Sequence, residues 1–188
     1  MNLFVVILKN MNVIDHYKWR YATKKFDTKK KISNSNIELI KESISLAPTS
    51  YGLQLFKVII VEKKEIKDDL KKASFNQSQI SDASHIFVFC NITKIVENDI
   101  DTYIKNKAAI QNKTISEISG YGDFLKDTLL KKEHNKISTW TANQVYIALS
   151  HLMTFCPSLG IDSCPIEGFE ASKYNEILKL NNRNLNST

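Results

Sequence analysis

Apolar positions along the chain form two short runs and one long helical pattern. Phe56 to Val61 and Ile86 to Ile92 are runs of β-branched and aromatic residues, which are typical of buried strands. From Trp140 to Cys156 apolar residues recur at helical spacing, which predicts a helix through the core. Pro157 interrupts this pattern and Gly160 follows it, so we expect the helix to kink or stop there.

Weaker patterns predict further helices along the chain. One begins near Ser33 or Ser35 and ends before Pro48, and Ser35 and Glu38 have capping-box spacing. The polar stretch from Asp99 to Lys132 reads as two helices that break near the glycines at its centre. The other helices are expected over Val13 to Tyr21, Lys64 to Ser74 and Ala171 to Leu180, and the central break is expected near Gly120 and Gly122.

Composition indicates one globular domain of 188 residues, 43% of them hydrophobic. The formal net charge of +6 favours anionic partners: nucleic acid, an acidic membrane or a phosphate-bearing cofactor. The lysines are scattered, which is typical of solvated surfaces, and no basic face carries interleaved aromatic residues. The charge alone does not choose among these partners, and no motif supports nucleic-acid binding.

The N-terminal segment and the cysteines indicate the cellular compartment. Leu3 to Leu8 is too short an apolar run to span a bilayer, and no small-residue cleavage site follows it. An extra strand, or an upstream start before Met11, is the preferred interpretation of residues 1–10. Cys90, Cys156 and Cys164 form no metal-ligand pattern and are expected to be reduced thiols, which suits a cytoplasmic protein.

Candidate chemistry is limited to groups that bind phosphates and polar ligands. The chain has no glycine-rich dinucleotide-binding turn, no P-loop and no set of nucleophile, base and orienting residue. What remains is Arg20 with Lys24, the Thr49-Ser50-Tyr51-Gly52 loop, Asn76 and the Pro165 to Gly168 turn. These residue types suit a phosphate and a polar ligand, and ordinary turn chemistry is the alternative.

Five segments in order resemble the FMN-dependent nitroreductase family, from about Ile14 to the end of the chain. They are RYATKKFD, APTSYGLQ, FNQSQISDASH, WTANQVYIAL and LGIDSCPIEGF, of which the last is the most specific. The resemblance implies a single α+β domain, a three-layer α/β/α sandwich with a mixed, mainly antiparallel sheet. It also implies an intertwined homodimer that binds FMN in two clefts at the subunit interface.

The resemblance also implies roles for particular residues. Arg20 would reach the FMN phosphate or ribityl chain, and Lys24 would lie near the pyrimidine edge and favour the reduced flavin. The Glu167 to Gly168 turn would donate a backbone N–H to flavin N5. The full set of implied cofactor-binding residues is Arg20, Tyr21, Ala22, Lys24, Pro48, Thr49, Ser50, Gly52, Asn76, Gln79, Gln144, Pro165, Ile166, Glu167 and Gly168.

Several positions depart from the family pattern. Ala22 stands where serine is usual, Gly52 replaces an asparagine, and Gln79 replaces a common lysine. Thr49, Ser50 and Gly52 would come from the partner subunit. The family also continues, past the segment that matches the last residues here, into a further strand and tail that hold the FMN phosphate. The alternative function is therefore a flavin-binding dimer with little turnover.

The activity implied is that of a flavin enzyme without an acid–base residue. NADH or NADPH would reduce FMN, and nitroaromatics, quinones or related small molecules would take the electrons in a ping-pong cycle. Phe124 or Leu125 would form a lid over the cleft. Neither nucleic acid, a membrane nor a metal ion is expected as a partner.

Overall fold

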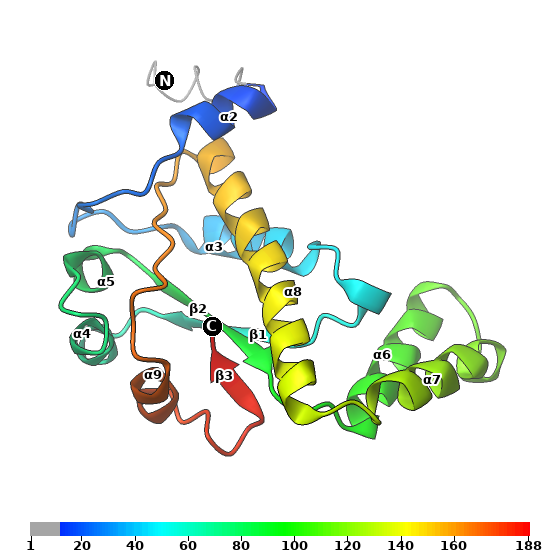
Figure 1. The fold of residues 1–188 in the computed structure, drawn as a ribbon. Helices are drawn as coiled ribbons and strands as arrows, with labels where there is room; N and C mark the ends of the chain where they lie inside the picture. The colour runs from blue at the N-terminus through cyan, green and yellow to red at the C-terminus, as the bar shows by residue number, and fades with distance from the viewer. Residues whose placement is uncertain (1–11) are drawn as a thin grey trace.

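The computed structural model describes residues 12–188, and its elements form three layers (Figure 1). The middle layer is an antiparallel sheet in the order β1 (Phe56–Val61), β2 (Ile86–Ile92) and β3 (Leu185–Ser187). Two helices, α3 (Asn34–Ser45) and α8 (His134–Phe155), cover one face of the sheet. On the other face lie α4 (Lys64–Lys72) and α9 (Ala171–Ile177).

The remaining elements connect these layers or project from them. In chain order they are α2 (Val13–Trp19), η1 (Ser50–Gly52), α5 (Ser78–Asp82), α6 (Glu97–Ile110), α7 (Ile115–Leu129) and η2 (Cys156–Leu159). The α+β class is confirmed. All strand pairs among the described residues are antiparallel, so the mixed sheet has no counterpart in this part of the chain. No described helix has the length and apolar character that crossing a bilayer requires.

The central strand β2 is apolar along its length because both of its faces are buried. Phe89 packs against α3 and α8, whereas its neighbours Val88 and Cys90 pack against α4 and α9. Alternate side chains of a strand point to opposite faces, so a strand between two helical layers needs apolar residues at consecutive positions. This is why the apolar runs predicted β1 and β2 with their observed bounds.

The helical hairpin of α6 and α7 packs with Leu53, Leu55 and Ile137 in a third core cluster, and the predicted break within the hairpin is wrong. Gly120 and Gly122 both lie inside α7, and the two helices are separated at residues 111–114 instead. A Cβ at Gly122 would lie 3.1 Å from Ile104 Cγ1, so this glycine allows α7 to approach α6 closely. The true start of α7 is a capping box formed by Thr114 and Glu117.

The start of α3 is the first of the two predicted positions, but the Ser35–Glu38 capping box is not formed. Ser33, not Ser35, is the N-cap, and its hydroxyl accepts a hydrogen bond from the Asn36 backbone N–H at 3.2 Å. Glu38 pairs with Lys41 at 2.8 Å instead of capping the helix. Both serines were possible caps by residue type, and the backbone turns into the helix at the earlier one.

The long helix α8 begins six residues before the predicted start and ends where expected. Its first turns are polar because they lie at the end of the molecule near the α6–α7 hairpin (Figure 1). Pro157 then forces the chain into the short 3-10 helix η2. Gly160 terminates η2 in the left-handed conformation, with φ of 67°.

The other differences are at element ends and in two short elements. The helices at Val13, Lys64 and Ala171 end two to three residues earlier than predicted, at Trp19, Lys72 and Ile177. Neither α5 nor β3 was predicted, because each is too short to give a periodic pattern. The interpretation of residues 1–10 lies outside the described residues.

Candidate functional site

The Arg20 to Lys24 segment lies beside the loop that leads to the Pro165–Gly168 turn. Thr23 is buried, and its hydroxyl donates a hydrogen bond to Asp162 Oδ1 at 3.3 Å. The helix before this segment, α2, packs against η2, which precedes the loop. Lys24 and Tyr21 are exposed and Ala22 is half-buried. The first and last of the five family-like segments are therefore neighbours in space.

Arg20 carries the clearest unsatisfied polar atom of this region. Its Nη1 atom is buried without a hydrogen-bond partner in the described part of the chain, as is the Ser163 Oγ atom of the adjoining loop. Burying a cationic nitrogen without an anion or acceptor is unfavourable. An anionic group such as a phosphate fits this position, because it would supply the acceptor that the protein does not.

Asn76 lies in a strained loop next to the turn. Phe75 and Asn76 both have left-handed backbone conformations, with φ of 52° and 58°, and Phe75 is exposed. Gln77 of the same loop donates from Nε2 to the Gly168 carbonyl at 2.8 Å. Strain of this kind costs about 1–3 kcal/mol per residue and is typical of functional sites.

The Pro165–Gly168 turn is open to solvent and is held by side chains from other elements. Pro165, Glu167 and Gly168 are exposed, and Ile166 is half-buried. The Tyr146 hydroxyl of α8 donates to Glu167 Oε1 at 2.7 Å. Tyr146, Gln77 and Ser163 were not among the predicted site residues, because no pattern in the sequence links them to the turn.

A second group of predicted residues surrounds η1. The Ser50 backbone N–H donates to Gln144 Oε1 at 2.8 Å, and Gln144 is 6% exposed. Pro48 and Ser50 are exposed, and Thr49 is half-buried. Tyr51, between Ser50 and Gly52, also has a left-handed backbone conformation, with φ of 59°. The structure thus brings Gln144 to the Pro48–Gly52 loop.

Aromatic side chains continue from this loop onto the α6–α7 hairpin. The Tyr51 ring lies 6.1 Å from Phe124 and 6.1 Å from Trp140, measured between centroids. Phe124 is 49% exposed, which suits a lid residue. Leu125 is fully buried in the core of the hairpin and does not face solvent, so the lid assignment of Leu125 is wrong. Consecutive helical residues point about 100° apart, and only one of the two can face the surface.

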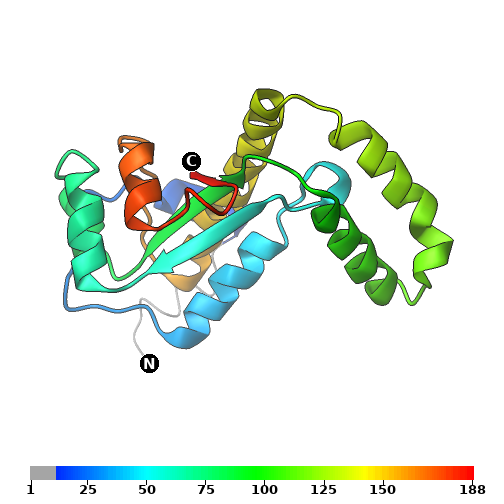
Figure 2. The ribbon, with the colours of Figure 1, turned by 90° about the horizontal axis from the view of Figure 1, so that it is seen from below.

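The two groups lie on opposite sides of α8. Gln144 contacts the Ser50 loop and Tyr146 contacts the Glu167 turn, and residues two apart on a helix point about 200° apart. Figures 1 and 2 show η1 on one side of α8 and the loop before α9 on the other. Within one protomer the structure does not bring the two groups together.

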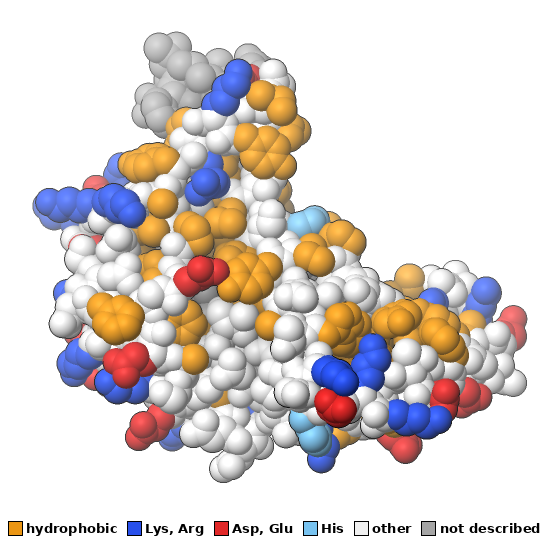
Figure 3. All heavy atoms as spheres, in the orientation of Figure 1, with side chains coloured by type: hydrophobic (Ala, Val, Ile, Leu, Met, Phe, Trp, Pro, Cys, Tyr) orange, Lys and Arg blue, Asp and Glu red, His pale blue; other side chains and the backbone are white. Residues whose placement is uncertain are grey.

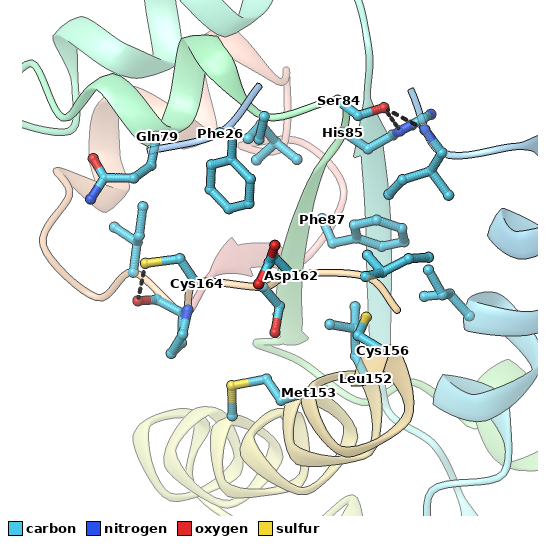
Figure 4. A pocket seen from close by; sticks show the side chains of 18 of the residues that line it. Phe26, Gln79, Ser84, His85, Phe87, Leu152, Met153, Cys156, Asp162 and Cys164 are labelled. Atoms are coloured by element: carbon cyan, nitrogen blue, oxygen red, sulfur yellow. Dashed lines mark hydrogen bonds between the residues drawn. The ribbon is translucent and has the colours of Figure 1, made fainter. Parts of the chain in front are cut away.

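A cavity of ≈ 680 Å³ adjoins the first group (Figure 4). The cavity lies along β2 from Ile86 to Phe89. Among the described residues, β3 pairs only with Cys90 to Ile92, so this part of the β2 edge has no strand beside it. Of the predicted residues, Gln79, Pro165 and Ile166 line it, whereas the rest lie outside.

Two titratable side chains along this cavity, His85 and Cys156, have structural surroundings. His85 Nδ1 and Ser84 Oγ share a hydrogen bond of 2.7 Å. The other ring nitrogen of His85, Nε2, lies 3.2 Å from Glu62 Oε1. Cys156 lines the cavity, and burial raises its pKa to about 12. Burial raises the pKa of Cys90 to about 12 as well. A thiol with so high a pKa is not a nucleophile at neutral pH.

Comparison with known proteins places these observations in one family. The model of the nitroreductase family matches residues 17–186. A Staphylococcus epidermidis protein with the name "Putative NAD(P)H nitroreductase" is 36% identical over 174 residues, which are 90% of this chain and 79% of that protein. A Bacillus subtilis protein of the same description is 32% identical, over 89% of this chain and 79% of its own length.

Solved structures share the fold. A nitroreductase-like protein from Exiguobacterium sibiricum, solved in complex with FMN, superposes with a TM-score of 0.82 at 20% identity, over 94% of this chain and 84% of that one. An enone reductase of gut-bacterial fatty acid saturation superposes with a TM-score of 0.82 at 19% identity, over 96% of this chain and 86% of that one. At such identities the likeness concerns the fold.

Proposed function

Since the chain belongs to the nitroreductase family, we propose that it is an FMN-dependent NAD(P)H oxidoreductase that reduces nitroaromatics, quinones or related acceptors. When bound, FMN supplies the hydride and electron chemistry. The residues of the chain bind the cofactor, orient it and set its electrostatic surroundings. No acid or nucleophile of the chain takes part.

The observation that carries this proposal is the buried, unpartnered Nη1 atom of Arg20. It lies in the segment that resembles the phosphate-binding part of the family, beside a loop with a second unpartnered atom, Ser163 Oγ. Arginine binds phosphate through charge-assisted hydrogen bonds. We assign Arg20 to the phosphate or ribityl chain of FMN for this reason.

The other residues of the first group would hold the flavin ring. Lys24 is exposed and would place its ammonium group at the pyrimidine edge, with Asn76 and Gln79 as polar contacts. The exposed Gly168 end of the turn would present a backbone N–H to flavin N5. Tyr21 and Ala22 would contribute backbone or ring contacts next to Arg20.

The second group would complete the site from a partner subunit. Pro48, Thr49, Ser50, Gly52 and Gln144 lie on the far side of α8 from Arg20, so one protomer supplies only part of the expected set. In a homodimer, the Pro48–Gly52 loop of one subunit would lie at the Arg20 group of the other, so each FMN would contact both groups. Phe124, on the α6–α7 hairpin beside this second group, would cover the acceptor.

An exposed apolar surface supports such a dimer. Exposed apolar residues lie on or next to α2 and on α8, and orange side chains gather over these two helices in Figure 3. Several exposed apolar side chains on neighbouring elements suit an interface. The residues are Val13, Ile14, Tyr17, Tyr21, Tyr146 and Ile147.

The test of the proposed function is reconstitution with FMN. The purified chain is titrated with FMN while flavin fluorescence and the visible absorption spectrum are recorded, and free FMN is then removed by gel filtration. We expect flavin to remain with the protein, and NADH or NADPH to bleach its visible absorption. A nitroaromatic or a quinone should then restore the colour.

Two outcomes would separate the alternatives. Protein that stays colourless with excess FMN would refute the proposed function. Protein that holds FMN but fails to pass electrons from NADH or NADPH to either acceptor would favour the flavin-binding dimer without useful turnover.

A further inference from the structure

The Glu167–Gly168 turn is held at two points by side chains outside the family-like segment that contains it. The Tyr146 hydroxyl donates to Glu167 Oε1 at 2.7 Å, and Gln77 Nε2 donates to the Gly168 carbonyl at 2.8 Å. Within the turn, the Phe169 N–H donates to the Glu167 carbonyl at 2.9 Å. These contacts restrain the Glu167 side chain, the Glu167 carbonyl and the Gly168 carbonyl, on either side of the Gly168 N–H.

Other contacts of this turn are few, because it lies in irregular backbone. Residues 165–168 belong to no helix or strand, and Glu167 and Gly168 are exposed. The next anchor is the Glu170 N–H, which donates to the Ala73 carbonyl at 2.8 Å. An exposed loop held by so few bonds samples several conformations unless side chains restrain it.

We infer that Tyr146 is a positioning residue for the flavin site, which acts by holding the Glu167 carboxylate and thereby orienting the Gly168 backbone N–H. This inference depends on the proposed function, since it assumes that FMN binds against the turn. Gln77 holds the Gly168 carbonyl, which belongs to the next peptide of the turn. Neither side chain needs to touch the cofactor for this role.

The chemistry of the pair suits a restraint. The hydrogen bond to Glu167 raises the pKa of Tyr146, because ionisation would place a phenolate beside a carboxylate. The tyrosine therefore remains a donor through the neutral range. With the carboxylate held by the hydroxyl, Glu167 is also kept from swinging toward a negatively charged reduced cofactor.

The experiment is a double-mutant cycle on FMN binding. Tyr146→Phe removes only the hydroxyl, Glu167→Ala removes the carboxylate, and the double variant removes both. The dissociation constant of FMN, the visible circular dichroism of the bound flavin and the unfolding temperature of the FMN-free protein are measured for each. Ser35→Ala, which removes an exposed hydroxyl from α3, is the control.

We expect Tyr146→Phe to weaken FMN binding about three- to tenfold, the factor that one net hydrogen bond is worth. Its flavin dichroism should change, and its unfolding temperature should not. In the Glu167→Ala background the tyrosine substitution should have no further effect, because the two residues act through one contact. Ser35→Ala should bind FMN as the parent protein does.

Several results would overturn the inference alone. In the first, the parent protein binds FMN and the Tyr146→Phe variant has the same affinity and the same flavin dichroism. In the second, the effects of Tyr146→Phe and Glu167→Ala on FMN affinity simply add. A parent protein that does not bind FMN would refute the proposed function first, so the two failures are distinguishable. Gln77→Leu is a second variant, expected to change the flavin dichroism in the same sense.

Discussion

At the residue scale, the buried guanidinium of Arg20 opposes the stability of the FMN-free chain, and the proposed phosphate contact would offset that cost. Its buried Nη1 has no partner in the part of the chain that the structure describes. An unsatisfied buried polar group costs about 1–3 kcal/mol, so the residue opposes the stability of the protein that it serves. Such a trade of stability for function is common at binding sites.

This trade gives a prediction for Arg20→Met. Methionine keeps much of the length of the side chain and removes the unpaired guanidinium, so the FMN-free variant should be more stable by about 1 kcal/mol. Its affinity for FMN should fall at least about tenfold, because a charge-assisted bond to phosphate is lost. Denaturant unfolding of the FMN-free protein and fluorescence titration with FMN measure the two effects.

Lys24→Met is the matched comparison, because Lys24 is exposed. It should leave the stability of the FMN-free protein unchanged while still weakening flavin binding or reduction. If Arg20→Met instead destabilised the FMN-free protein, the guanidinium would have a partner that stabilises the fold, and the phosphate assignment would lose its support.

Gly168 offers a second test at this scale. A Cβ at this position would meet Gln77 Nε2 at 3.4 Å and Phe75 Cδ2 at 3.9 Å, both ordinary contact distances. We therefore expect Gly168→Ala to fold with nearly unchanged stability, within about 0.5 kcal/mol. Against a flavin ring the added methyl group would clash, so FMN binding should fall sharply. A variant that retains the parent affinity would show that the cofactor does not approach this backbone.

At the element scale, β2 is paired along nearly all of its length on one side and along half of it on the other. Ile86 to Asn91 pair with β1, whereas only Cys90 to Ile92 pair with β3. The Thr188 N–H donates to the Phe89 carbonyl at 2.9 Å, which ends the ladder there. Beyond it, the β2 edge faces the cavity from Ile86 to Phe89.

This arrangement predicts alternating amide protection. In an antiparallel ladder, N–H groups of successive residues point to opposite neighbours. The Ile92 N–H points to Leu55, next to β1, so the Val88 N–H points to β1 and the Phe87 N–H points to the cavity. In the 188-residue chain, amide hydrogen exchange measured by NMR should be at least about tenfold faster at Phe87 than at Val88. Equal protection would mean that a further segment pairs with this edge.

How much of these elements was predictable depends on how local their causes are. The runs that form β1 and β2 and the stop at Pro157 are local, and they were predicted correctly. Gly122 was misread as a break because its cause is the approach of Ile104 from α6, a contact between helices. Thr114 and Glu117 did form a readable capping box, so the start of α7 could have been predicted from the sequence.

The site residues also divide into those that the sequence indicated and those that only the fold reveals. The order of the five family-like segments led to Arg20, Asn76 and the 165–168 turn, and the structure brings these segments together through Thr23 and Gln77. The contact of Gln77 with Gly168 joins residues 91 positions apart. Tyr146 lies 21 positions from Glu167 on a helix whose pattern indicates only burial. Without the fold, neither side chain could be assigned to the turn.

At the scale of the whole molecule, the question is whether each site draws on one subunit or on two. Gln144 and Tyr146 direct the two groups of predicted residues to opposite sides of α8, and an apolar surface on α2 and α8 is exposed in the single chain. If a dimer forms through this surface, Ser50 of one protomer would meet the Arg20 site of its partner. A two-fold dimer would then contain two equivalent shared sites.

Subunit complementation tests this arrangement. Arg20→Ala removes the phosphate contact, and Ser50→Trp places a bulky ring at an exposed loop position that would block the cleft. Each variant alone should form a dimer in sedimentation and should bind little FMN. When the two variants are co-expressed, a mixed dimer has one site with both substitutions and one with neither. Random pairing should therefore restore FMN to about one quarter of the sites.

A site formed within a single protomer gives the opposite result, because every protomer in the mixture carries one damaging substitution. No FMN binding would then return on co-expression, even though mixed dimers form. A monomer in sedimentation that still holds FMN would lead to the same conclusion. Recovery near one quarter, with the mixed dimer confirmed by differently tagged chains, requires Arg20 and Ser50 to meet across the interface. That result would also explain why α8 separates the two groups in each protomer.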